Sequence, residues 1–256
     1  MKITVFTSDS NRHINLINLL ANLCRKLYVI QERRQSQKNY DVIDIAHKYF
    51  NNVYLAQEKI FPQNKILNNK KIKLLSIKSG ELSNLKLKNI AEYLESNLFI
   101  VFGASYIKGD LIKFLKKNRA INIHAGVSPY YRGTDCNFWA LYDNKPHLVG
   151  STIHLLSEGL DNGPILYHAM PEININPFEY TMSSIKSAFI SLSQKIEDRS
   201  IFEIEPVKQD FTKEIRFSKK KDFNSNVVEN YFRKNINLEN IKFDKTLLIK
   251  PFFQKN

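Results

Sequence analysis

The chain has 256 residues, which is room for one large domain or for one sizeable domain with an appendage. Hydrophobic residues make up 43% and charged residues 25%, a balance that excludes a disordered chain, and two isolated cysteines exclude both a disulfide framework and a zinc site. The formal net charge of +13 favours polyanionic partners, but the lysines are scattered through segments rich in asparagine and isoleucine, and a compositional bias explains the charge equally well.

The first ten residues, MKITVFTSDS, open directly on a short apolar run and lack the layout of a signal peptide. No run approaches the roughly 18 apolar residues that crossing a bilayer requires. We therefore expect a cytoplasmic protein.

The first hundred residues alternate between strand and helix patterns. Residues 3–7 predict a buried strand, and the turn and capping residues 8–10 precede an amphipathic helix in which apolar residues recur every three or four positions. A strand is expected at 28–30 and helices around 40–50 and at 89–96, whereas residues 59–88 give no assignment. This β-α-β order predicts an α/β fold with a mostly parallel sheet.

The second part of the chain continues the pattern. We expect strands at 98–102, 120–124, 149–156 and 165–170, and helices at 111–118 (capped by Asp110), 138–142 and 178–198, with a loop at 125–134. Beyond residue 204 the pattern weakens, which predicts a catalytic domain at 1–204 and a small C-terminal extension at 205–256.

One predicted strand ends in polar residues that could carry out chemistry. Side chains alternate across a strand, so Asn122 and His124 share one face while Ile121 and Ile123 share the other. Ligands of open parallel sheets bind beyond the carboxyl ends of the strands, which is where this pair is expected. Taken alone, the pair could equally be two satisfied polar residues at a strand end.

Asp161 follows in a loop between two glycines, where it could orient His124 and stabilise its charged form. An amide can donate to a developing oxyanion, and an imidazole can exchange protons near neutral pH. The segment offers no evident serine or cysteine nucleophile, which suggests direct attack by a substrate on an acyl carbon. These residues indicate acyl transfer without identifying the acyl group.

The stretch from about residue 98 to 170 resembles the folate-dependent formyltransferases, a family that includes glycinamide ribonucleotide, methionyl-tRNA and sugar N-formyltransferases. Four fragments in the right order carry this resemblance: Asn122-Ile-His124, Pro129-Tyr-Tyr-Arg132-Gly133, Gly150-x-Thr152-Ile-His154 and Asp161-x-Gly163-Pro-Ile. The resemblance implies a Rossmann-like sheet and a catalytic role for Asn122, His124 and Asp161.

The resemblance also implies 10-formyltetrahydrofolate as the formyl donor. No group of residues has the spacing of zinc ligands, so no metal is expected. Donor contacts would come largely from the backbone of two loops, formed by Gly103, Ala104, Ser105, Tyr106 and Ile107 and by Glu158, Gly159 and Leu160.

The expected acceptor is the primary amine of a nucleotide-linked amino sugar, bound with the help of Arg12, Tyr131, Arg132 and Gly133. An arginine suits a diphosphate, but Arg12 could instead be a solvated helix-cap residue and Arg132 could brace its loop through backbone carbonyls. For His154 a structural role is favoured.

Other functions remain open: a methionyl-tRNA formyltransferase, a hydrolase releasing formate from the folate, or a non-enzymatic, basic nucleic-acid-binding module. A homodimer is also left open.

Overall fold

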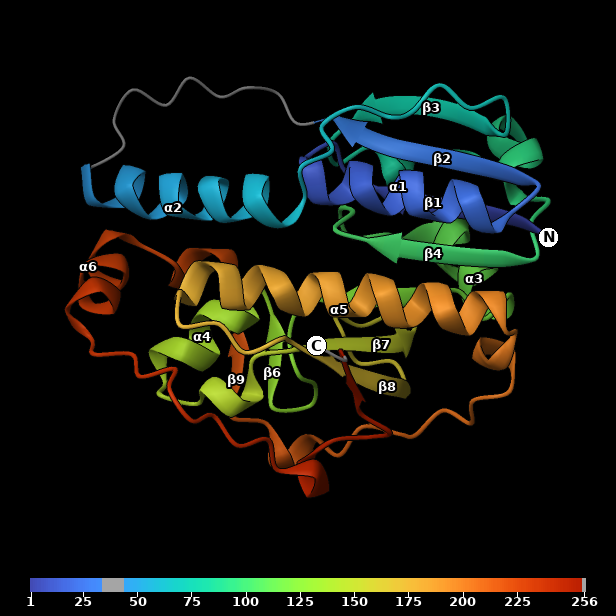
Figure 1. The fold of residues 1–256 in the computed structure, drawn as a ribbon. Helices are drawn as coiled ribbons and strands as arrows, with labels where there is room; N and C mark the ends of the chain where they lie inside the picture. Colours follow the sequence, from blue (N-terminus) through green and yellow to red (C-terminus); the bar gives the residue numbers. More distant parts are fainter. Residues whose placement is uncertain (34–43, 255–256) are drawn as a thin grey trace.

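The computed structural model describes residues 1–33 and 44–254. Eight strands form one sheet in the order β10-β8-β7-β5-β4-β1-β2-β3 (Figure 1). Five of them, β3, β2, β1, β4 and β5, run parallel, and β7 is antiparallel to both of its neighbours, β5 and β8. Their bounds are β1 Lys2–Thr7, β2 Lys26–Arg33, β3 Ile72–Lys78, β4 Leu98–Phe102, β5 Ile121–His124, β7 Ser151–Leu155, β8 Ile165–Met170 and β10 Phe252–Phe253. The expected α/β class with a mostly parallel sheet is confirmed.

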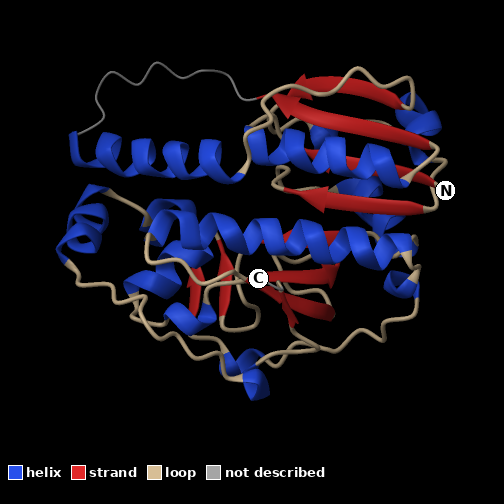
Figure 2. Ribbon diagram, in the orientation of Figure 1, coloured by secondary structure: helices blue, strands red, loops and turns tan. Residues whose placement is uncertain are grey.

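Helices cover both faces of this sheet (Figure 2). One face packs with α1 (Asn11–Leu23) and α5 (Pro177–Glu197), and α2 (Asp44–Ile60) lies against α5. The other face packs with α3 (Gly109–Lys117) and the 3-10 turns η1 (Leu82–Asn84) and η2 (Leu87–Leu94). Successive residues of β4 divide between the two layers, with Ile100 on the α5 side and Val101 on the α3 side, so this strand reads as an unbroken apolar run.

Several sequence predictions need correction. The second strand is longer than 28–30, and the unassigned stretch 59–88 contains the strand β3. Helix α2 runs ten residues past the predicted end, while the start of that prediction, residues 40–43, lies outside the described part. Asp110 is within the first turn of α3 and is not its cap. Ser10 is the N-cap of α1, and its backbone carbonyl accepts from His13 and Ile14, but its side chain makes no capping bond.

Residues 205–254 fold back along the rest of the molecule. Strand β9 (Arg216–Ser218) pairs with β6 (Tyr131–Gly133), a short strand inside the predicted loop 125–134, and β10 pairs with β8 of the main sheet. Helix α6 (Ser225–Arg233) contacts α2, and α4 (Cys136–Tyr142) follows β6. The division at residue 204 stays a prediction, but the later segment supplies strands to both sheets. Within residues 1–33 and 44–254, no helix is both long enough and apolar enough to cross a membrane.

Candidate active site

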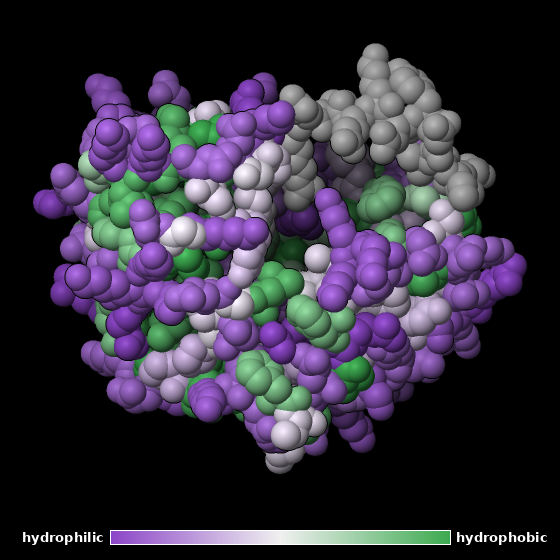
Figure 3. Space-filling view, turned by 180° about the vertical axis from the view of Figure 1, so that it is seen from behind, coloured by the Kyte–Doolittle hydropathy of each residue, from purple (hydrophilic) through white to green (hydrophobic). Residues whose placement is uncertain are grey.

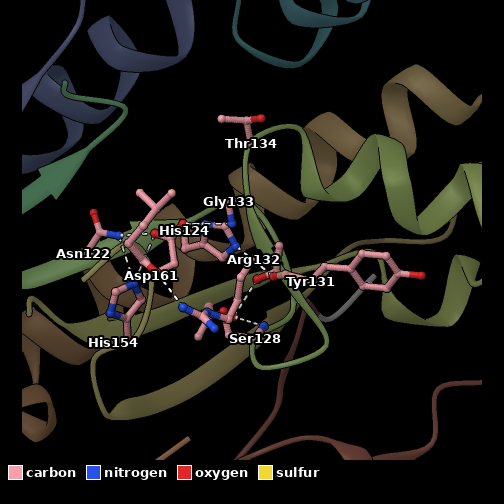
Figure 4. Close-up of polar contacts among 12 residues, drawn as sticks. Asn122, His124, Ser128, Tyr131, Arg132, Gly133, Thr134, His154 and Asp161 are labelled. Atoms are coloured by element: carbon pink, nitrogen blue, oxygen red, sulfur yellow. Dashed lines mark hydrogen bonds and ion pairs between the residues drawn. The ribbon is translucent and has the colours of Figure 1, made fainter. Parts of the chain in front are cut away.

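Asn122 and His124 lie on the face of β5 opposite to Ile121 and Ile123, as the alternation predicts, and both isoleucines are buried in the α5-side core. The antiparallel strand β7 places His154 directly beside Asn122. These three side chains therefore project from two neighbouring strands on one side of the sheet, and Figure 4 shows them gathered around Asp161.

Asp161 contacts both predicted partners. Its Oδ2 lies 3.3 Å from His124 Nδ1, and its Oδ1 accepts from Asn122 Nδ2 at 3.3 Å (Figure 4). The backbone N–H of Gly133 donates to Oδ2, also at 3.3 Å. The carboxylate thus joins the end of β5 to the loop that follows it, and the structure brings together the three residues predicted to be catalytic.

His154 fixes the orientation of the Asn122 amide. His154 Nδ1 lies 2.9 Å from the carbonyl oxygen of Leu155 and must donate to it, so Nε2 is left as an acceptor. Asn122 Nδ2 lies 2.9 Å from that Nε2 and also donates to the Asp161 carboxylate. Because both of these neighbours accept, the amide nitrogen and not its oxygen must face them.

Burial and charge act against each other at this cluster. Burial raises the pKa of Asp161, but the neighbouring His124 and the backbone N–H of Gly133 lower it further, and the resulting pKa is about 2. Burial lowers the pKa of His124, while the Asp161 carboxylate acts to raise it. His124 Nε2 also lies 3.2 Å from the Tyr131 carbonyl oxygen, so each ring nitrogen faces an acceptor. At neutral pH the site therefore holds an ionised aspartate beside a histidine that can take up or release a proton.

Two glycines allow the close packing of this site. A Cβ at Gly126 would lie 2.6 Å from His124 Nε2 and 2.5 Å from the Cβ of Cys136. A Cβ at Gly163 would lie 1.7 Å from the Leu155 carbonyl oxygen, the group that orients His154. Both positions need glycine because another chain segment occupies the space of a side chain.

The residues predicted to bind the acceptor have different surroundings. The ring of Tyr131 is 1% exposed and its hydroxyl donates to Asp143, so a substrate contact through this side chain has no support, and its carbonyl faces His124 instead. Gly133 contacts Asp161 through its backbone. Arg12 lies in the first turn of α1, with its Nε 3.5 Å from His13 Nε2.

Arg132 braces its surroundings in the described structure. Its guanidinium pairs with Glu214 at 2.7 Å and donates to the Leu160 carbonyl at 3.0 Å. It also lies 4.4 Å from the ring centre of Phe211 and 5.1 Å from that of Phe217. Of the two roles considered for Arg132, these contacts favour bracing.

The two loops predicted to bind the donor are linked. The Tyr106 hydroxyl donates to the backbone carbonyl of Glu158. Glu32, a buried residue near the end of β2, binds Ser105. Its carboxylate accepts from the Ser105 backbone N–H at 2.5 Å and from the Ser105 hydroxyl at 2.7 Å. Glu32 also accepts from the backbone N–H of Gly80 at 2.7 Å. The surface is hollowed on the face shown in Figure 3.

The structure adds three residues to the site that were not predicted from the sequence: Glu32, Glu214 and Gln209. Gln209 is buried and donates to the carbonyls of Asp161 and Gly163. Glu32 lies two residues beyond the predicted strand 28–30, near the carboxyl end of a parallel strand, and that position is a signal that could have identified it. Nothing in the local sequence connects residues 209 and 214 with a loop some fifty residues earlier.

Curated proteins that the chain resembles include methionyl-tRNA formyltransferases. A methionyl-tRNA formyltransferase from Thermotoga neapolitana is 34% identical over 116 residues, which cover 44% of this chain and 36% of that protein. One from Trichodesmium erythraeum is 25% identical over 132 residues, covering 50% of this chain and 38% of that protein. The match thus spans little more than a third of these relatives.

Solved structures share the fold. An N-formyltransferase from Helicobacter canadensis, in complex with folinic acid and dTDP-3-aminofucose, matches with a TM-score of 0.53 and 17% identity, over 91% of this chain and 80% of its own. A phosphoribosylglycinamide formyltransferase from Anaplasma phagocytophilum matches with a TM-score of 0.53 and 15% identity, over 80% of this chain and 89% of its own. The family model described as formyl transferase matches residues 29–197, well over half of the chain, and the protein belongs to that family.

Proposed function

We propose that this protein transfers a formyl group from 10-formyltetrahydrofolate to the primary amine of a nucleotide-linked amino sugar in the cytoplasm. The observation that carries the proposal is the convergence of Asn122, His124 and Asp161 at the end of β5, in a member of the formyl transferase family. An amide donor, a proton-exchanging imidazole and a carboxylate suit transfer between two amines without a protein nucleophile.

The two linked loops suit a flat, partly apolar donor. Tyr106 is 49% exposed and Leu160 is 40% exposed, so each loop presents an apolar side chain on the surface. Glu32 holds one loop through Ser105, which limits its movement. The Helicobacter canadensis protein of the same fold was solved with folinic acid, a folate, which supports a folate donor here.

We assign Asn122 and His124 to the formyl oxygen. During the transfer this oxygen gains negative charge, and donors already in place stabilise that charge more in the transition state than in the ground state. Both N–H bonds of Asn122 are directed at His154 and Asp161, so the whole amide must rotate and give up one of these bonds when it donates to the substrate. The bond that remains then holds the amide at the end of β5.

The donor supplies a formyl carbon bonded to nitrogen, so the reaction exchanges one amide for another. A bond forms between the acceptor nitrogen and the formyl carbon, and the bond from that carbon to the donor nitrogen breaks. The acceptor nitrogen loses a proton and the departing nitrogen gains one, which leaves the proton balance at zero. His124 can carry this proton because the adjacent Asp161 carboxylate stabilises its charged form.

Two observations support a small acceptor. The H. canadensis protein was solved with a nucleotide-linked amino sugar, and the segment after residue 204 folds onto this protein's own sheet edge. The α1 N-terminus, with Arg12 in its first turn, has the polarity that a diphosphate requires.

The alternative acceptor is methionyl-tRNA, and the names of the curated relatives favour it. Phosphate contacts would make its binding fall steeply with added salt. Salt dependence therefore separates the two acceptors independently of the chemistry.

The test incubates the protein with 10-formyltetrahydrofolate and either a panel of nucleotide-linked amino sugars or charged methionyl-tRNA, and follows the mass of each acceptor. A gain of one formyl group on a sugar supports the proposal. Formylation of the tRNA alone overturns the acceptor, and release of formate without an acceptor indicates a hydrolase. Asn122→Ala and His124→Ala should abolish the transfer, while His47→Ala on the exposed side of α2 is the matched control.

A further inference from the structure

The backbone at Asp161 has an unusual conformation. Its φ is +48°, in the left-handed region that residues other than glycine rarely adopt. Such a conformation persists where surrounding contacts hold it in place. Because the Asp161 carboxylate lies 3.3 Å from His124 Nδ1, any relaxation of this backbone would move the carboxylate away from the imidazole.

One side chain holds the backbone on both sides of this residue. Gln209 Nε2 donates to the carbonyl of Asp161 at 2.9 Å and to that of Gly163 at 2.7 Å. Both partners accept, so the amide nitrogen and not the oxygen must face them. The Gln209 Oε1 atom, in turn, is buried without a hydrogen-bond partner in the described structure, so this residue leaves one buried acceptor unmatched while it makes two bonds to the loop.

A second contact holds the preceding carbonyl. Arg132 donates to the carbonyl of Leu160, and Glu214 and Phe211 fix its guanidinium in turn. Three carbonyls of one short loop, at 160, 161 and 163, are thus bound by side chains. Gln209, Phe211 and Glu214 all come from the segment after residue 204.

We propose that Gln209 is a positioning residue for formyl transfer, which holds the Asp161 backbone so that its carboxylate faces His124. This inference rests on the proposed function of the site. Gln209 acts through two backbone carbonyls and touches neither substrate. Its loss should therefore lower kcat while leaving the KM for the folate donor unchanged.

The test compares Gln209→Met, which keeps the length of the side chain but removes both donors, with the exposed neighbour Lys208→Met as the matched control. We expect Gln209→Met to lower kcat at least tenfold with the donor KM within about twofold, because small misplacements of catalytic groups have large effects. In an Asp161→Asn background the same change should lower kcat by less than twofold, because the group that it positions has already lost its charge.

A second readout does not depend on activity. NMR follows the chemical shifts of the histidine ring nitrogens in labelled protein as the pH is changed. The signal of His124 is identified as the one that is missing in His124→Ala. Asp161 acts to raise the pKa of His124, so Gln209→Met should shift that titration to lower pH while Lys208→Met leaves it unchanged. If Gln209→Met does not fold, Gln209→Asn takes its place, since the shorter amide cannot reach both carbonyls.

Unchanged titration of His124, kcat within twofold of the native protein, or an equal loss of kcat in the Asp161→Asn background would each overturn the proposal. If the native protein formylates no acceptor, the proposed function fails, and the His124 titration alone still decides the role of Gln209.

Discussion

Replacing Asp161 with asparagine removes the charge at the centre of the site while preserving its shape. Asparagine tolerates the left-handed backbone better than most residues, so the φ of +48° does not confound the result. Its amide oxygen can still accept from the Gly133 N–H. The change therefore removes the negative charge beside His124 and also one acceptor, because the new amide nitrogen takes the place of the Oδ1 atom that accepts from Asn122.

The expected loss of stability in Asp161→Asn follows from the pKa of Asp161. Lowering the pKa of Asp161 from its ordinary 3.8 to about 2 corresponds to about 2 kcal/mol of folding stability, at roughly 1.4 kcal/mol for each tenfold change. Because the folded pKa is the lower one, this contribution is fully present above pH 4 and is lost as the pH falls through about 2. Asp161→Asn should thus be about 2 kcal/mol less stable than the native protein at pH 7, and the gap should narrow between pH 4 and 2.

The assay is urea unfolding at pH 7 and at pH 3, alongside formyl transfer at pH 7. We expect kcat to fall at least about a hundredfold, the lower end of what a proton-transfer group contributes. Asp161→Ala is the companion variant, and alanine should cost about 1 kcal/mol more in stability because it is strained at positive φ. Equal stability of Asp161→Asn and the native protein at pH 7 would refute the inferred stabilisation of the ionised Asp161 carboxylate in the folded state.

Three further predictions concern groups around the site. Burial lowers the pKa of His168 to about 4. Keeping this ring neutral therefore contributes about 3 kcal/mol of folding stability above pH 6.5, and this contribution is lost as the pH falls to 4. In His168→Gln, the free energy of unfolding measured in urea should change less with pH across that range. Gly163→Ala should lower the melting temperature by several degrees, because its Cβ would meet the Leu155 carbonyl at 1.7 Å, and an unchanged melting temperature would contradict the packing. Glu32→Gln should raise the KM for the donor several-fold at constant kcat, because a neutral amide oxygen accepts more weakly from Ser105 than a carboxylate does. Initial rates measure both constants, and a changed kcat with constant KM would contradict the role of Glu32 in donor binding.

The centre of the site could be predicted from sequence because it depends on local geometry. Alternation along β5 places Asn122 and His124 on one face, and this arrangement is confirmed. Asp161 lies 39 residues beyond Asn122, and it was predicted from the order and spacing of the sequence fragments and from the glycines on either side of it. Short β-branched runs of low polarity likewise predicted β1, β4 and β8 to within a residue.

What could not be predicted depends on distant partners. Strand β3 is a half-exposed edge strand rich in lysine, so its apolar pattern is weak. Strand β6 forms only because β9 pairs with it, and Ser218 bonds to Arg132 across 86 residues. The same long-range pairing turns Arg132 towards Glu214, which no local pattern indicates.

The pairing of β6 with β9 also bears on how the protein is made. The strand that carries Asn122 and His124 can join β4 and β7 once about 155 residues have been synthesised. The loop beyond it gains its partner only when residues 216–218 have left the ribosome, and β8 gains β10 only after residue 253. Contacts between segments so far apart form slowly, so the nascent chain builds most of its sheet before its catalytic loop is fixed. Activity should therefore appear only after nearly the whole described chain has emerged.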